Sequence, residues 1–110
     1  MSFNMYFLDL EKFEKFMFSL NKPQRRAVHQ WLVEVQKWDF DRLLRSERVK
    51  SLQGGLFEFR IQRQPDLLVR VFFCFQGEFE WLVLHAYDKL KKPQTRWQTR
   101  QINIARKLIP

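Results

Sequence analysis

The sequence predicts an α+β fold, in which a small and mostly antiparallel sheet has its helices packed on one face. Two observations predict this class. Apolar residues recur at helical spacing in the first third of the chain, and the period changes to two after Gly55. The predicted order is strand, helix, helix, three strands in a meander, and a last helix. A chain of 110 residues suits one domain, 1–110, with a modest core.

The N-terminal part begins with a short apolar run, Met5–Leu8, that is long enough for one strand. Asp9 can then cap a helix. Asn21, Pro23 and Gln24 indicate a second helix start, because they combine an Asn cap, a first-turn Pro and a Gln at the capping-box position. The two helices are expected to form a hairpin. Their predicted apolar sides comprise Leu10, Phe13, Phe16, Met17 and Leu20 in the first helix, and Val28, Trp31, Leu32, Val35 and Trp38 in the second.

The rest of the chain divides into a loop, a meander and a helix. Asp39–Ser51 has no clear periodicity and is expected to be a loop. Phe57–Ile61 alternates apolar and charged residues, while Leu67–Phe75 and Phe79–Tyr87 are rich in residues that favour strands. The last helix is expected after Pro93.

The parity of the strand residues predicts which side chains share a face. On the first meander strand the apolar residues suit the helix-covered face, so Arg60 should lie on the open face. Arg70 stands in an apolar strand, and because an unpaired buried guanidinium is costly it should reach the open face or pair with a carboxylate such as Glu58. Such a pair could also be purely structural. On the last strand one side is expected to carry Trp81, Val83, His85, Tyr87 and Lys89.

Positive charge is concentrated at one end of the chain. The net charge is +8, and Lys89–Pro110 contains seven basic residues and no acidic one. The first 41 residues sum to zero. This distribution indicates an anionic partner, with nucleic acid as the leading candidate, because phosphate neutralisation releases counterions. A solvated basic face without a partner remains the alternative.

Several classes of site are excluded by the residues available. Two His and one Cys at unrelated spacings do not form a zinc or iron site, and no carboxylate cluster suggests magnesium. Phosphate-loop and nucleophile-elbow motifs are also missing. We therefore expect chemistry without metal or cofactor, carried by Arg, Lys, His or Tyr. A single Cys, an N-terminus unlike a signal peptide and the lack of a long apolar run predict a cytoplasmic protein without a membrane anchor.

Four segments together resemble the RelE/HigB-type toxins of bacterial toxin–antitoxin pairs, especially the phage-derived Gp49-like branch. They are Val49–Ile61, Val69–Phe73, Leu82–Lys89 and Gln101–Arg106, and they occur in the family's order. The resemblance covers Val49 to the C-terminus, and the helical hairpin agrees only in pattern. The stretch Lys91–Thr99 is longer than in the family by about three residues.

The resemblance implies a ribosome-dependent mRNA endoribonuclease that uses the ribose 2′-hydroxyl to attack the adjacent phosphorus. It implies that Arg60 and Arg70 stabilise the phosphorane charge and that His85 acts as acid or base. It also implies a cognate antitoxin, expected to be a helix-turn-helix protein, in a hetero-oligomer with the toxin. Further RNA contacts are expected from Lys50, Lys89, Lys91, Lys92, Arg96 and Trp97.

Two alternatives stay open at this point. The same superfold hosts ParE-type toxins, which bind DNA gyrase and lack nuclease residues, and it could also provide a nucleic-acid-binding module without activity. Trp97 could stack on a base or fill the core beneath the last helix. Phe18 lies off the apolar side of its helix and is a candidate contact for the antitoxin.

Overall fold

The computed structural model describes residues 3–63 and 65–110. Its elements are β1 (Asn4–Phe7), α1 (Leu10–Phe18), α2 (Lys22–Val35), α3 (Phe40–Arg45), β2 (Val49–Ser51), β3 (Phe57–Arg63), β4 (Leu67–Gly77), β5 (Glu80–Asp88) and α4 (Thr95–Lys107). The strands form one sheet in the order β1-β5-β4-β3-β2. Only β1 runs parallel to its neighbour, β5, and the other pairs are antiparallel. The predicted α+β class is confirmed.

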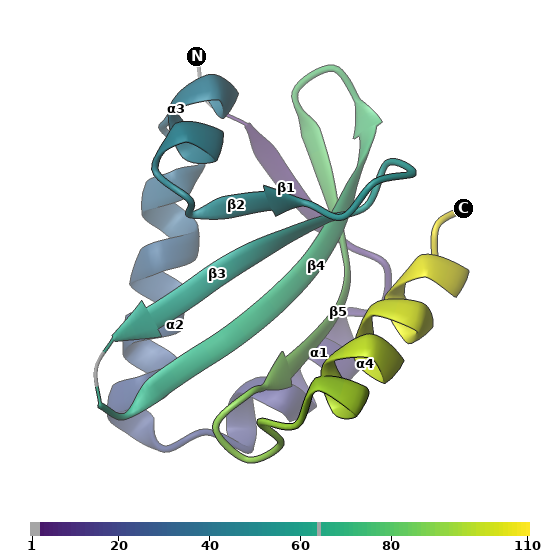
Figure 1. The fold of residues 1–110 in the computed structure, drawn as a ribbon. Helices are drawn as coiled ribbons and strands as arrows, with labels where there is room; N and C mark the ends of the chain where they lie inside the picture. Colours follow the sequence, from purple (N-terminus) through teal and green to yellow (C-terminus); the bar gives the residue numbers. More distant parts are fainter. Residues whose placement is uncertain (1–2, 64) are drawn as a thin grey trace.

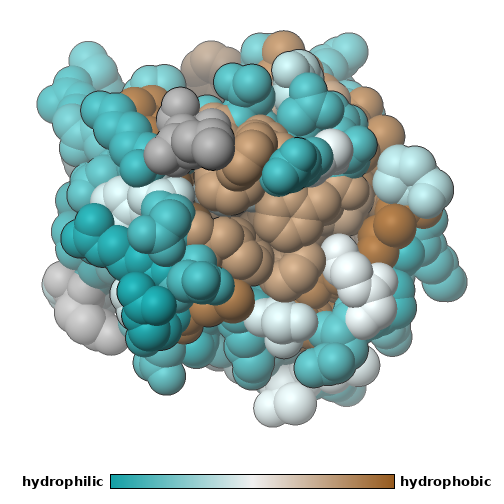
Figure 2. Space-filling view, turned by 90° about the horizontal axis from the view of Figure 1, so that it is seen from above, coloured by the Kyte–Doolittle hydropathy of each residue, from teal (hydrophilic) through white to brown (hydrophobic). Residues whose placement is uncertain are grey.

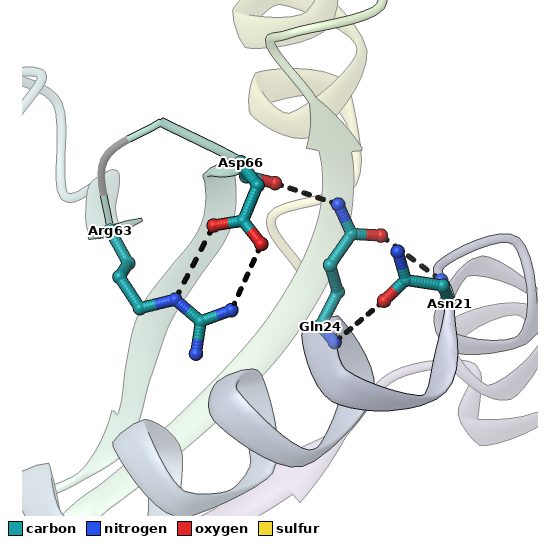
Figure 3. Close-up of polar contacts among 4 residues, drawn as sticks. All are labelled: Asn21, Gln24, Arg63 and Asp66. Atoms are coloured by element: carbon teal, nitrogen blue, oxygen red, sulfur yellow. Dashed lines mark hydrogen bonds and ion pairs between the residues drawn. The ribbon is translucent and has the colours of Figure 1, made fainter.

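The N-terminal helices begin where side chains satisfy their free backbone N–H groups. The Asp9 carboxylate accepts from the N–H of Lys12 at 3.0 Å. Asn21 and Gln24 form a reciprocal capping box, as predicted. The Gln24 side chain also donates to the carbonyl of Asp66, 2.7 Å away, so the cap fixes α2 to the turn between β3 and β4 (Figure 3).

The apolar sides of these helices cover one face of the sheet. Val28, Leu32 and Val35 of α2 are buried, which confirms the predicted stripe. The prediction was wrong for Leu10, whose side chain is 52% exposed. Leu10 is the first residue of α1 and directly follows the exposed Asp9, so it lies at the turn and not in the packed part of the helix.

The segment 39–51 is not the predicted loop, because it contains α3 and β2. Asp39 caps α3 by accepting from the N–H of Arg42 at 2.8 Å, and Leu43 is fully buried. A helix of six residues and a strand of three are too short to display a measurable period. The sequence pattern therefore could not reveal them.

Helix α4 lies on the opposite face of the sheet from α1 and α2 (Figure 1). The predicted placement of all helices on one face is therefore wrong. Both parities of β4 are apolar, with Val71 and Phe73 packed under α1–α3 and Phe72 and Cys74 packed with α4. A strand that is apolar on both faces needs cover on both.

A β-bulge in β5 changes which side chains share a face. Phe73 pairs with Val83 but Phe72 pairs with His85, so Leu84 is an extra residue in the strand. Trp81 and Val83 consequently belong to the core under α1–α3, while His85 and Tyr87 align with β4 residues of the α4 side. The predicted common side for Trp81, Val83, His85, Tyr87 and Lys89 is thus wrong.

The core under α1–α3 is mainly aromatic. Phe59 and Phe73 stack with ring centroids 4.1 Å apart, and Trp81 packs against both. Near α3 and the turn between β4 and β5, Phe3, Phe40 and Phe79 line a hollow of about 430 Å³. Figure 2 looks onto this end and shows apolar side chains gathered in the middle with polar ones around them. Within residues 3–63 and 65–110, no helix is long and apolar enough to cross a membrane.

Candidate functional site

The face of the sheet that carries α4 contains a buried carboxylate between two guanidinium groups. Glu58 and Arg70 are each only 2% exposed. The Nε atoms of Arg60 and Arg70 lie 3.8 and 3.9 Å from the same Glu58 oxygen, Oε1. Arg60 and Arg70 are direct partners across β3 and β4, and Arg60 keeps 32% of its side chain exposed. The Arg60 guanidinium is therefore available to a ligand, and the buried Arg70 beside it adds a second positive charge.

Unsatisfied polar atoms are concentrated on this same face. In the described part of the chain, six buried side-chain nitrogen or oxygen atoms lack a hydrogen-bond partner, and only Trp81 Nε1 belongs to the other face. Buried polar groups in folded proteins are normally hydrogen-bonded, so such a cluster is a feature of functional sites. The other five atoms are Glu58 Oε2, Arg60 Nε, Arg70 Nε, His85 Nδ1 and Tyr87 Oη.

Burial disfavours the charged form of both Glu58 and Arg70. Burial raises the pKa of Glu58, and the nearby charges of Arg70 and Arg60 offset this only in part. Burial also lowers the pKa of Arg70, and the charge of Glu58 opposes that shift. Since desolvation is the larger effect for both groups, this pair is a weak source of stability.

Two lysines and a tyrosine complete the surroundings of Glu58. Lys50 is its direct partner on β2 and is exposed, whereas Lys89 is half-buried at the end of β5. Burial, followed by the charge of Arg70, lowers the pKa of Lys89. Tyr87 is the direct partner of Arg70 on β5, and burial followed by the charge of Glu58 raises the pKa of its hydroxyl. Tyr87 therefore stays protonated at neutral pH.

His85 lies one position further along the same face and is held by α4. Its Nε2 is 2.5 Å from Oε1 of Gln101, and its ring is parallel to that of Phe72, its partner on β4. Because the Gln101 oxygen can only accept, Nε2 carries the proton and Nδ1 has the free lone pair. Burial lowers the pKa of His85, against the effect of the Gln101 hydrogen bond, so the neutral ring is favoured near pH 7.

A second basic group lies at the N-terminal end of α4. The Lys92 ammonium and the Arg100 guanidinium lie 4.7 and 5.1 Å from the centroid of the Trp97 ring. Arg96, Trp97 and Arg100 line an open cavity of about 360 Å³. Trp97 is half-buried and belongs to neither core cluster of the described residues, so it does not fill the core beneath α4. Cation–π contacts orient the basic side chains around its ring.

The predicted site residues therefore separate into two groups. Lys50, Arg60, Arg70 and Lys89 surround Glu58, and His85 lies beside them without a direct contact to the arginines. At the other group, Lys92, Arg96 and Trp97 gather at the start of α4, while the Lys91 ammonium donates to the carbonyl of Ser19 at the end of α1.

Sequence reasoning did not identify Tyr87 and Gln101 as parts of the site. The alternation of the strand had already placed Tyr87 on the side of His85, but it assigned Tyr87 no role. Gln101 gave no such signal, because its role depends on how α4 packs across β5. In the described ranges, no three His, Cys, Asp or Glu side chains gather where they could hold a metal ion.

Comparison with known families places the chain in context. The model of the phage-derived protein Gp49-like family (DUF891) matches residues 15–109, which include the end of α1, all of α2, the meander and α4. The chain belongs to this family. Gp49-like proteins fall broadly within the RelE/HigB-type toxin superfamily. No protein with a curated description matches the chain. The Gp49-like match therefore also covers α2 and residues 15–18 of α1, a region where the sequence resemblance was only one of pattern.

Proposed function

We propose that this Gp49-like protein is the toxin of a toxin–antitoxin pair and cleaves mRNA on the translating ribosome. The observation that carries the proposal is the group of cations around Glu58, with the partly exposed Arg60 beside the buried Arg70. A guanidinium offers two donors in the geometry of a phosphate. Membership of the Gp49-like family supports the reaction class.

In the proposed reaction the ribose 2′-oxygen attacks the adjacent phosphorus while its proton passes to a base. The bond from phosphorus to the 5′-oxygen breaks, and that oxygen takes a proton from an acid. The products are a 2′,3′-cyclic phosphate and a 5′-hydroxyl. Arg60, supported by Arg70, stabilises the extra negative charge that develops on the phosphorane oxygens.

The opposite pKa shifts of His85 and Tyr87 suit the two proton-transfer roles. His85 is neutral because burial lowers its pKa, and its free Nδ1 can accept the 2′-proton. Tyr87 remains protonated because burial raises its pKa, and its unpaired hydroxyl can donate to the leaving oxygen. Groups whose environments shift their pKa values in opposite directions are candidates for a base and an acid.

The remaining predicted residues contact RNA outside the reacting centre. Lys50 and Lys89 are placed to bind phosphates beside Arg60. At the start of α4, Lys92, Arg96 and Trp97 offer charge and an aromatic ring, the combination that single-stranded RNA recognition uses. Lys91 extends this basic group towards α1.

A toxin of this kind requires an antitoxin, for which we propose a helix-turn-helix protein that forms a hetero-oligomer with it. Phe18 is 74% exposed, the largest exposed fraction among the large apolar side chains of the described residues. Such a side chain is a suitable anchor for a partner. Co-purification of the neighbouring gene product tests this pairing. Phe18→Ser should weaken the complex, and a complex that leaves growth inhibition unchanged would contradict the antitoxin role.

Primer extension in a translating extract tests the nuclease directly. Wild-type protein should create new mRNA ends, while Arg70→Ala should not. A matched control is Arg63→Ala, since Arg63 forms an exposed pair with Asp66 in the turn between β3 and β4. If wild-type protein creates no new ends, the nuclease proposal is wrong. Inhibition of gyrase in a supercoiling assay would instead identify a ParE-like toxin.

A further inference from the structure

A polar cavity of about 290 Å³ lies where β2 begins, beside the part of the β3 edge that β2 does not cover. Its lining combines both sides of the sheet edge, because Arg60 comes from the α4 face and Trp31 from the α2 face. The N–H of Arg60 donates to the carbonyl of Arg48, which is the last link between β3 and the chain leading into β2. The other lining residues are Ser46, Glu47, Arg48 and Gln62. Its volume is close to the lower limit of ligand pockets, about 300 Å³.

Arginine side chains are arranged on tryptophan rings beside this cavity. Arg42 and Arg48 lie over the ring of Trp38, at 3.6 and 4.4 Å from its centroid, and Arg48 also approaches Trp31 at 5.9 Å. Within residues 3–63 and 65–110, neither guanidinium forms an ion pair. The rings hold both groups in place while their donors stay free for an anion.

The turn that carries Arg48 has an unusual backbone. Glu47 has φ of 63°, in the left-handed region that Gly or Asn normally occupies at the end of a helix. This conformation costs roughly 1 kcal/mol or more for such a residue. Strained residues cluster at binding sites, and here the strained turn directs the chain from α3 into β2 beside the cavity.

We propose that this cavity binds a nucleotide of single-stranded RNA next to the one held at Arg60, with Arg48 and Arg42 contacting the phosphates that follow. Arg60 joins the two sites, because it pairs with Glu58 on one side and lines the cavity on the other. The cavity offers the positive charges of Arg48 and Arg60 and the ring of Trp31, and single-strand sites combine such features. The inference rests on RNA being the ligand of the proposed function, but it concerns binding and not cleavage.

Binding of a fluorescein-labelled single-stranded RNA tests the inference. The RNA is 2′-O-methylated throughout so that it cannot be cleaved, and its affinity is measured by anisotropy between about 50 and 200 mM salt. Arg48→Gln should weaken binding about tenfold and reduce the slope of log affinity against log salt by about 0.7, the value of one phosphate contact. Arg42→Gln should reduce the slope in the same way. Because Arg42 is exposed, this substitution should disturb the fold less than Arg48→Gln. Arg26→Gln is the matched control, because Arg26 is exposed on α2 and its loss changes the net charge equally.

The outcomes separate this inference from the nuclease. If both Arg48→Gln and Arg42→Gln reduce the slope and Arg26→Gln does not, the cavity binds RNA even where the wild-type protein fails to cleave mRNA. If all three variants behave alike, the inference is wrong even where the wild-type protein cleaves. If Arg48→Gln spares RNA binding and weakens the antitoxin complex, the edge of β3 is a protein-binding edge, which also overturns the inference.

Discussion

The two faces of the sheet differ in what they bury. Under α1–α3 the buried side chains are apolar, and aromatic rings such as Phe59, Phe73 and Trp81 contact one another. On the α4 side an apolar cluster around Phe72 is followed, further along β3 and β4, by the Glu58–Arg70 pair. All but one of the unsatisfied buried polar atoms in the described residues lie on this second face.

The difference indicates where stability and where function are located. Apolar burial stabilises the fold by roughly 25 cal/mol per Å², so the first face supplies most of the favourable energy. The second face instead keeps two charged groups from water, with pKa shifts that show desolvation exceeding their attraction. A buried ion pair stabilises a fold only if the attraction within the pair and its hydrogen bonds offset the cost of removing the charges from water. For Glu58 and Arg70 that cost is the larger effect.

The largest predicted effect is on the stability of the first face. Phe59→Ala should lower the free energy of unfolding by about 3–5 kcal/mol, because the ring is fully buried and stacks on Phe73. Urea denaturation followed by circular dichroism measures this change. Activity per folded molecule should remain, since Phe59 points away from Glu58. Loss of activity in the folded fraction would show that the two faces are not separate in function.

The reverse result is expected for the second face. Arg70→Ala should lower the rate of mRNA cleavage by about 100- to 1,000-fold, the usual effect of removing one charge-stabilising donor. The buried Glu58 left behind can take up a proton, which its raised pKa favours, so the fold should survive. Cleavage rates and circular dichroism are measured on the same sample. A rate within a few-fold of Arg63→Ala would mean that Arg70 is only structural.

Replacing the whole buried pair sharpens the contrast. Glu58→Leu with Arg70→Met should raise the free energy of unfolding by about 1–4 kcal/mol and abolish cleavage, because apolar residues remove the desolvation penalty. Glu58→Leu alone should lower it by about 3–5 kcal/mol, since the buried Arg70 would lose its carboxylate and keep only its hydrogen bonds to Gln62 and the carbonyl of Val69. Thermal or urea unfolding of the three proteins checks both signs. A less stable double variant would show that the pair stabilises the fold.

The sequence predicted the first face better than the second. Helix starts at Asp9 and Asn21 and the stripe of α2 follow from local capping and spacing, and both are confirmed. The faces of β3 also follow, because strict alternation places Phe57, Phe59 and Ile61 together in the core under the helices. These features depend only on residues close in sequence.

The second face depends on features that local patterns do not encode. The bulge at Leu84 places His85 and Tyr87 on the face opposite to Trp81 and Val83. No Gly, Pro or other sequence signal in this part of β5 predicts the bulge. The position of α4 depends on long-range contacts, such as the bonds from Arg106 to the carbonyls of Leu52 and Gln53. For Arg70 the sequence left two alternatives, the open face or a carboxylate partner, and its pairing with Glu58 resolves them.

The smallest predicted effect concerns how α4 tunes His85. The Gln101 hydrogen bond raises the pKa of His85 against the larger lowering by burial. A base works when unprotonated, so cleavage should rise with pH through the pKa of His85, and the acid limb of the profile should lie below the ordinary value of about 6.5. In Gln101→Leu this limb should move to still lower pH. The maximal rate should fall by up to about tenfold, because a hydrogen bond worth roughly 0.5–1.5 kcal/mol no longer orients the ring.

Gln98→Leu, one turn earlier on α4, is the control and should leave the profile unchanged. A limb that moves to higher pH, or does not move, would exclude His85 as the base.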